Sequence, residues 1–285
     1  MRFSRVLRTG ALVAAVGLTL AACGQPNSEE DANKSLVQRA EDNGSLTIGV
    51  KIDQPGLGLK KPDGSYEGFD VDVATYVAKE LGVEEGDIEF VETPSAQREN
   101  MIQKGDVDMI VATYSITPER DEAVDFAGPY FLAHQDLLVR KGDDSIQGAE
   151  DLNKNKKLCS VKGSTSAQNV RDDFAPKAQL QEYGGYSECL TGVENEAIDA
   201  MTTDDTILAG YAAQQPGKFQ LVGAELSNEN YGIGLREGDD EGKKALDEAI
   251  QKMIDSGEWK KAAQQHFGPA GYEVPEAPTV GEVVE

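Results

Sequence analysis

Histidine, tryptophan and cysteine are scarce: the chain of 285 residues contains two histidines, one tryptophan and three cysteines. His134 and His266 do not stand at the spacing of metal ligands, so no metal site is expected. The sequence also lacks the Gly-x-Ser-x-Gly and His-Glu-x-x-His motifs and any Cys-His arrangement. These absences argue against an enzyme, and no cofactor is expected.

Positive charge is in deficit, with 27 Lys and Arg residues against 51 Asp and Glu residues and a net charge of −24. Such a balance argues against nucleic acid and against an anionic lipid surface as partners. The same excess of negative charge repels an anionic ligand at long range. A site for an anion must therefore be a local cluster of positive side chains.

Long apolar runs are also few, and the clearest one is at the N-terminus. Three arginines within the first eight residues precede an apolar run over residues 10–22. A spanning helix needs roughly 20 apolar residues, so this run is short for a membrane span. A positive head, a short apolar core and small residues before a cleavage site predict a secretory signal peptide over residues 1–22.

The cleavage site contains a cysteine. The segment Leu20-Ala21-Ala22-Cys23 resembles the bacterial lipobox, which implies that Cys23 is lipidated and anchors the protein to the outside of the cell membrane. The alternative is a plain signal peptide with an incidental cysteine. Residues 23–44 are predicted to be a flexible tether, since the segment that follows Cys23 is polar and acidic without periodicity.

Cys159 and Cys189 remain as an even pair in an oxidising compartment. This predicts a disulfide, with two free thiols as the alternative.

Short β-branched strands alternate with helical patterns, which is typical of βαβ units and a mostly parallel sheet. Strands are expected at 46–52, 88–92, 107–113, 135–140, 158–161, 180–183, 197–202, 219–222 and 231–235. Ser95 is expected to cap a helix that ends at Gly105. The pattern restarts after Arg140, which predicts two lobes joined by two crossing strands.

The lobe boundaries follow from these crossings, expected near 137–140 and 233–236. Lobe 1 is predicted over residues 45–138 and completed by 236–270, and lobe 2 over residues 139–235. Residues 271–285, rich in Pro, Val and Glu, are predicted to be a disordered tail.

Two segments resemble the polar amino-acid class (family 3) of bacterial extracellular solute-binding proteins. One is Gly68-Phe69-Asp70-Val71-Asp72-Val73 with the helical positions Val77, Ala78 and Leu81 after it. The other runs from Ala112 to Arg120 and continues with Val124-Asp125-Phe126 and Pro129-Tyr130, and it is similar to the ligand-carboxylate segment of that family. The resemblance extends over nearly all of residues 45–268.

This resemblance implies an α/β, two-lobed periplasmic-binding-protein-like fold of type II. Each lobe would be a mostly parallel sheet flanked by helices, with a two-strand hinge. It also implies a monomer that captures an amino acid by hinge closure and delivers it to an ABC permease. An enzyme on the same fold, such as a dehydratase, is the alternative from another class. A ligand-sensing domain of a receptor or channel is a further one.

An amino acid carries a carboxylate and an ammonium, and a cleft that removes both from water must pair both. Arg120 is expected to hold the carboxylate with its planar fork, and Ser115 to donate a second hydrogen bond. A helix that begins at Ser164 and Thr165 would add main-chain N–H groups.

The ammonium is assigned to Asp204, as its place in the family pattern implies, with Asp205 as the alternative. The carbonyl of Thr113 could accept from the same group.

Lys51 and Arg98 favour an acidic ligand, glutamate first. Lys51 ends a strand at the expected cleft. Arg98 opens a helix, where a positive charge opposes the helix dipole, so helix stability does not explain it. The alternative for these two residues is surface pairing, of Lys51 with Asp53 and of Arg98 with Glu92 or Glu99.

Glutamine or asparagine is the second candidate ligand, and a basic amino acid the last. Tyr186 is a further candidate for a hydroxyl that lines the cleft.

Overall fold

Two long strands carry the chain between the lobes. In the computed structural model, which describes residues 34–285, β7 (Asp125–Arg140) runs antiparallel to its partners. It pairs with β12 (Asn228–Leu235) over its first part and with β10 (Ala200–Asp204) over its last part. The predicted signal peptide, the lipidated Cys23 and the tether residues before 34 lie outside the described residues.

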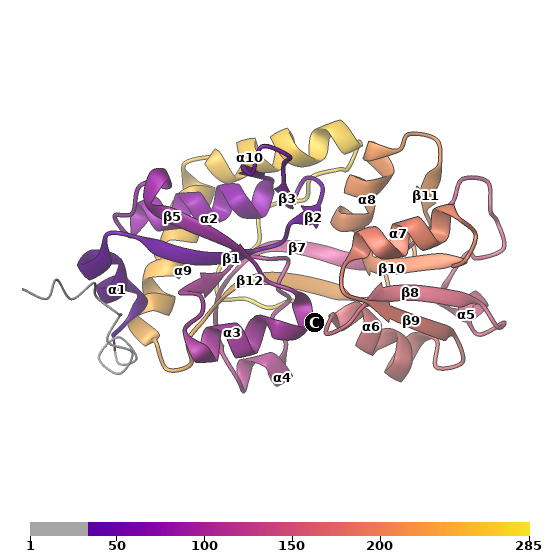
Figure 1. Ribbon diagram of the computed structural model, residues 1–285, viewed down its shortest axis with the longest axis horizontal. Coiled ribbons are helices and arrows are strands. Elements are labelled where there is room, and N and C mark those ends of the chain that lie inside the picture. The colour runs from indigo at the N-terminus through magenta and orange to yellow at the C-terminus, as the bar shows by residue number, and fades with distance from the viewer. Residues whose placement is uncertain (1–33) are drawn as a thin grey trace, which may run out of the picture. The chain divides into compact units, whose positions relative to one another are not determined.

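Lobe 1 is built on parallel strands with helices on both faces. β5 (Ile88–Glu92), β1 (Leu46–Val50) and β6 (Met109–Ile110) are parallel neighbours, and β12 and β7 complete this part of the sheet. In Figure 1 the helices α2 and α10 lie on one side of these strands, and α3 and α4 on the other. The helices of this lobe are α1 (Leu36–Asn43), α2 (Phe69–Glu80), α3 (Arg98–Lys104), α4 (Pro118–Asp121), α9 (Asp240–Asp255) and α10 (Glu258–Phe267).

A three-stranded antiparallel sheet of β2 (Asp53–Gln54), β3 (Gly58–Lys60) and β4 (Tyr66–Glu67) follows β1. Its last turn is the predicted one at 62–64. No helix within residues 34–285 is both long and apolar enough to cross a membrane.

Lobe 2 repeats the plan. β10, β8 (Lys157–Val161) and β9 (Gln179–Tyr183) are parallel, while β11 (Phe219–Leu221) and the end of β7 run antiparallel to each other. The helices of this lobe are α5 (Ala149–Leu152), α6 (Thr165–Asn169), α7 (Tyr186–Glu194) and α8 (Asp205–Gln214). Figure 1 shows α7 and α8 on the opposite side of the strands from α6.

The strand partner of β7 changes near the first predicted crossing. β7 pairs with β12 up to His134 and with β10 from Gln135 onward. The lobe boundaries at 138/139 and 235/236 stay predictions. β12 begins three residues before the predicted strand because its first residues, Asn228 to Asn230, are polar and gave no apolar signal.

The predicted strand over 107–113 is much shorter in the structure. β6 comprises only Met109 and Ile110, and after it the backbone turns at Thr113, whose φ of 44° lies in the left-handed region. Ser95 does not cap the following helix either. It begins a short 3₁₀ turn, Ser95–Gln97, and α3 starts at Arg98.

The segment before β1 is a helix, which corrects the prediction of a tether up to residue 44. The side chain of Ser35 caps α1 in a capping box with Gln38. Leu36 is fully buried, and its N–H donates to Asp239 at 2.6 Å. The sequence showed no sign of this helix because eight residues show little apolar periodicity and because the residues that it contacts, such as Asp239, are far along the chain.

The C-terminal segment is packed, so the prediction of a disordered tail over 271–285 was wrong. Tyr272 and Val274 pack against the main core, and the N–H of Gly281 donates to the carbonyl of Gly128 at 2.9 Å. The amide of Asn230 forms two hydrogen bonds with the main chain of Val284, at 2.9 and 3.0 Å. These partners lie in β7 and β12, which the composition of the segment does not indicate.

Candidate functional site

A small cavity of about 10 Å³ lies where the two lobes meet. Its lining comprises Ser95, Arg98, Thr113, Ser115 and Arg120 from lobe 1, and Ser164, Thr165, Tyr186 and Asp204 from lobe 2. Eight of these nine residues are among the predicted ligand contacts. Ser95 lines the cavity but was not predicted. Lys51 was predicted but does not line the cavity.

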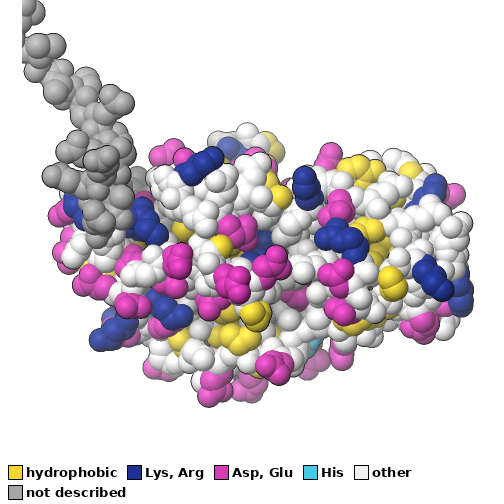
Figure 2. Space-filling view, turned by 90° about the horizontal axis from the view of Figure 1, so that it is seen from below, with side chains coloured by type: hydrophobic (Ala, Val, Ile, Leu, Met, Phe, Trp, Pro, Cys, Tyr) yellow, Lys and Arg dark blue, Asp and Glu magenta, His cyan; other side chains and the backbone are white. Residues whose placement is uncertain are grey.

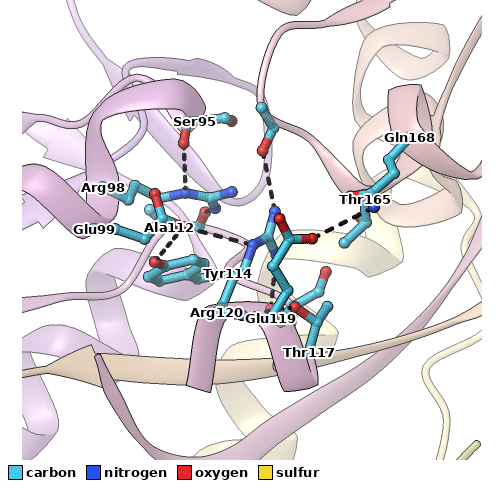
Figure 3. Close-up of polar contacts among 12 residues, drawn as sticks. Ser95, Arg98, Glu99, Ala112, Tyr114, Thr117, Glu119, Arg120, Thr165 and Gln168 are labelled. Atoms are coloured by element: carbon cyan, nitrogen blue, oxygen red, sulfur yellow. Dashed lines mark hydrogen bonds and ion pairs between the residues drawn. The ribbon is translucent and has the colours of Figure 1, made fainter. Parts of the chain in front are cut away.

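Arg120 joins the lobes. The side chain of Thr117 caps α4 by accepting from the N–H of Arg120, which sets the direction of the arginine. Its Nη1 donates to the carbonyl of Ser115 at 2.7 Å, and its Nη2 donates to the carbonyl of Gly163 in lobe 2 at 3.1 Å (Figure 3). Nε lies 3.6 Å from a carboxylate oxygen of Glu99. The guanidinium is thus held at the cavity by both lobes.

Arg98 is fixed against the backbone of lobe 1. Its Nη1 donates to the carbonyls of Ala112 and Thr113 at 3.0 and 3.3 Å, and its guanidinium lies 4.0 Å from the centre of the Tyr114 ring. Burial, with a smaller effect of Arg120, lowers the pKa of Arg98 to about 10, so it stays charged at neutral pH. Its Nη2 forms no hydrogen bond within residues 34–285.

The surface pairing considered for Arg98 is therefore wrong. Arg98 is only 2% exposed, and Glu99 instead accepts from the hydroxyl of Tyr114 at 2.7 Å.

Lys51 lies behind Ser95. Its Nζ donates to the Ser95 hydroxyl at 2.7 Å and to the carbonyl of Thr93 at 3.1 Å. Burial, together with the charge of Arg98, lowers its pKa well below the usual value. Lys51 lines a neighbouring cavity with Gly184 and Gly185. It can influence the central cavity only through Ser95 or by its charge.

Asp70, the first acid of the family-like segment, fixes the backbone at Thr113. It accepts from the N–H of Thr113 at 2.8 Å and from the hydroxyl of Tyr130 at 2.9 Å. Burial raises the pKa of Asp70 to about 6, although both hydrogen bonds oppose that shift. A threonine with positive φ is strained, and this buried carboxylate holds it in place.

Asp204 presents a carboxylate from lobe 2. It ends β10 and accepts from the hydroxyl of Tyr231 at 2.6 Å and from that of Ser166 at 3.5 Å. Burial and the nearby Glu229 raise its pKa well above the usual value. The alternative, Asp205, does not line the cavity and accepts from the main chain of His134.

The other predicted residues of lobe 2 also line the cavity, and α6 is short. Ser164 caps α6 by accepting from the N–H of Ala167 at 3.1 Å, and α6 has five residues before the chain continues as a π-helical turn, Val170–Phe174. Tyr186, the first residue of α7, is 4% exposed, and burial raises the pKa of its hydroxyl.

Ser115 is oriented differently from the prediction that it donates to a ligand carboxylate. Its hydroxyl donates to Glu229 at 2.5 Å, and the hydroxyl of Thr165 donates to the same carboxylate oxygen at 2.8 Å. Glu229 was missed from the sequence, because the strand that carries it was expected to begin at Tyr231.

The disulfide between Cys159 and Cys189 is confirmed. It joins β8 to α7, with a Cα–Cα distance of 5.5 Å. α7 begins with Tyr186, so the bond ties this lining residue to the sheet of lobe 2.

Residues 46–269 match the bacterial extracellular solute-binding proteins, family 3. The chain belongs to this family. The family resemblance predicted from the sequence and the two-lobed α/β fold are confirmed, and an extracellular solute-binding family implies a location outside the cytoplasm.

Two relatives extend over most of the chain. The glutamate-binding protein GluB of Corynebacterium efficiens is 46% identical over 275 residues, which cover 93% of this chain and 92% of the relative. The ABC transporter glutamine-binding protein GlnH of Bacillus subtilis is 40% identical over 247 residues, which cover 85% of this chain and 89% of the relative.

A solved structure of an ancestral arginine-binding protein bound to glutamine is similar to the fold, with a TM-score of 0.74 and 35% identity. The match covers 79% of this chain and 98% of the ancestral protein.

Proposed function

We propose that this chain is the solute-binding component of an ABC amino-acid importer and that it binds glutamate. The observation that carries the proposal is the charge of the central cavity. Arg98 and Arg120 line it against one lining carboxylate, that of Asp204, so the lining has one more basic side chain than acidic ones. Glutamate at neutral pH carries one net negative charge, so it matches this balance.

The assignment of groups follows from the available donors and acceptors. Arg120 pairs with the α-carboxylate, because a guanidinium offers two parallel donors to a carboxylate. Asp204 accepts from the ammonium. Arg98, with Nη2 free of other hydrogen bonds within residues 34–285, binds the side-chain carboxylate.

Binding closes the lobes. The ligand's two ends contact different lobes, so it favours the closed form by contacts that the open form cannot make. The long strands β7 and β12 serve as the hinge. The closed form then docks on the membrane permease as a monomer.

The molecular surface supports a recessed site for an anion. Acidic side chains are spread over the face shown in Figure 2, with Lys and Arg between them. An anionic ligand therefore finds its positive charge in the cavity between the lobes. Anchoring through lipidated Cys23 after removal of residues 1–22 keeps the protein at the membrane.

Glutamine is the second candidate, since a relative that is 40% identical carries that name. Isothermal titration calorimetry with glutamate and glutamine separates the two. Glutamate is expected to bind at least about tenfold more tightly, because a neutral amide leaves a buried positive charge unpaired. Tighter binding of glutamine would overturn the acidic assignment while leaving the importer role in place.

The Arg98→Gln variant tests the side-chain site. It removes the excess positive charge and is expected to reduce the preference for glutamate over glutamine about tenfold or more. Lys244→Gln, at an exposed lysine of α9 that pairs with Glu248, removes one positive charge away from the cavity and is the control; it is expected to leave the preference unchanged.

A further inference from the structure

Glu229 is a buried carboxylate in the hinge strand that no part of the proposed binding scheme uses. It is 2% exposed and lies next to the crossing between the lobes. Its Oε2 accepts from Ser115 of lobe 1 and from Thr165 of lobe 2, and its Oε1 accepts from the hydroxyl of Ser227 at 2.8 Å. Within residues 34–285 no Lys or Arg forms an ion pair with it.

The hydrogen bonds to Glu229 determine whether the hydroxyls of Ser115 and Thr165 can donate to a ligand or only accept from it. The hydroxyls of Ser115 and Thr165 both donate to Oε2 of Glu229, and each hydroxyl has only one hydrogen. Their oxygens then offer only lone pairs to the cavity. A ligand ammonium fits such oxygens, whereas a ligand carboxylate does not.

The cavity lining offers enough acceptors for the three hydrogens of an ammonium. They are the carboxylate of Asp204, the hydroxyl oxygens of Ser115 and Thr165, and the carbonyl of Thr113, which has a second lone pair beside the one used by Arg98. Glu229 and Tyr231 are two residues apart on β12, so both point to the same face of the strand. One orients Ser115 and the other orients Asp204.

We propose that Glu229 is a positioning residue for the ammonium group of the ligand. It fixes the hydroxyl oxygens of Ser115 and Thr165 as acceptors toward the cavity. Because it binds one hydroxyl from each lobe, its full set of hydrogen bonds exists only when the lobes are together. The inference rests on the proposed function in that it requires an amino-acid ligand.

Two ligands separate this role from a purely structural one. L-Glutamate has the amino group, whereas glutarate is the same diacid without it. Glu229→Gln is expected to weaken the binding of glutamate, measured by calorimetry, about tenfold and the binding of glutarate less than threefold. Where glutarate is too weak for direct titration, its dissociation constant is taken from displacement of glutamate. An equal loss for both ligands, or no loss, would overturn the proposal.

A double-mutant cycle tests whether Glu229 acts through Ser115. Ser115→Ala alone is expected to weaken the binding of glutamate more than that of glutarate. Adding Glu229→Gln to this variant is expected to reduce the affinity for glutamate clearly less than Glu229→Gln does in the wild type. Additive losses would contradict the coupling. If Glu229→Gln does not fold, Ser115→Ala with the two ligands still decides, because a serine that donates to a carboxylate would affect both alike.

Glu237→Gln, at an exposed position beyond the other end of β12, controls for the loss of one negative charge and is expected to change neither affinity. The wild-type titration comes first and tests the proposed function separately. If glutamine is the ligand, the same cycle is run with glutamine and its counterpart without the amino group. If no amino acid binds, both proposals fail.

Discussion

Arg120 and Gly163 connect the two lobes: Nη2 of the arginine donates to the main-chain oxygen of the glycine at 3.1 Å. The glycine leaves no room for a side chain at this contact. A Cβ added to Gly163 would lie 2.6 Å from the Cα and 2.8 Å from the N of Ala96 in lobe 1. The close approach of the lobes at the cavity therefore requires glycine at this position.

Gly163→Ala is expected to prevent full closure and to weaken ligand binding by about tenfold or more, since backbone atoms of Ala96 cannot move aside as a flexible side chain could. Its φ of 79° adds backbone strain in the open form as well. Gly217→Ala is the matched control, because φ is 82° there and nothing lies within 4 Å of the added Cβ. Calorimetry on both variants checks the prediction. Equal affinities would contradict it.

Arg120→Lys tests the role of the planar fork. A lysine keeps the charge but cannot donate two parallel hydrogen bonds, and it cannot reach both Ser115 and Gly163. The affinity for the ligand is expected to fall about 100-fold, while the thermal stability of the ligand-free protein changes little. Near wild-type affinity would show that charge alone holds the carboxylate.

Asp70 predicts a pH dependence of stability. Its pKa is raised to about 6 in the folded protein, so protonated Asp70 favours the fold, and this contribution is lost as the pH rises through 6. Asp70→Asn has no such loss. Between pH 5 and pH 7.5 the free energy of unfolding of the wild type is expected to fall by about 1 kcal/mol relative to the variant.

Urea denaturation at the two pH values measures this difference. Asp87→Asn, at an exposed aspartate, serves as the control for the loss of a charge. A difference between wild type and Asp70→Asn that does not change with pH would show that Asp70 titrates normally.

Removal of the C-terminal segment after Gly271 is expected to destabilise the protein. The segment buries apolar side chains against the core and forms hydrogen bonds with β12, which together contribute roughly 2 kcal/mol or more. Tyr272→Phe keeps the ring but removes the hydrogen bond to Asp205, and it is expected to cost about 1 kcal/mol. Thermal unfolding of both variants checks the order. An unchanged melting temperature after truncation would contradict the packing of this segment.

Most of the residues that line the cavity could be named from the sequence because the segments that carry them resemble the family pattern. Taken singly, Arg120 in a Thr-Pro-Glu-Arg turn or Ser164 before a helix would indicate only a surface residue or a helix cap. The strands of both lobes also followed from apolar, β-branched segments, since burial in a sheet selects such residues.

The residues that were missed depend on contacts between distant segments. Glu229 is polar at the start of a buried strand, and its donors, Ser115 and Thr165, lie in the two lobes. Lys51 directly follows β1, and its side chain donates to Ser95 and does not line the cavity. Apolar periodicity cannot report such pairings, because it records only which side of an element is buried.

The most direct test of the account is a thermal-shift screen of the purified protein against the common amino acids at pH 7. A ligand that binds only the folded state raises the melting temperature by mass action. We predict that glutamate produces the largest shift, with a smaller one for glutamine. A largest shift with a basic amino acid, or no shift with any amino acid, would contradict the proposed binding of glutamate in the cavity between Arg98, Arg120 and Asp204.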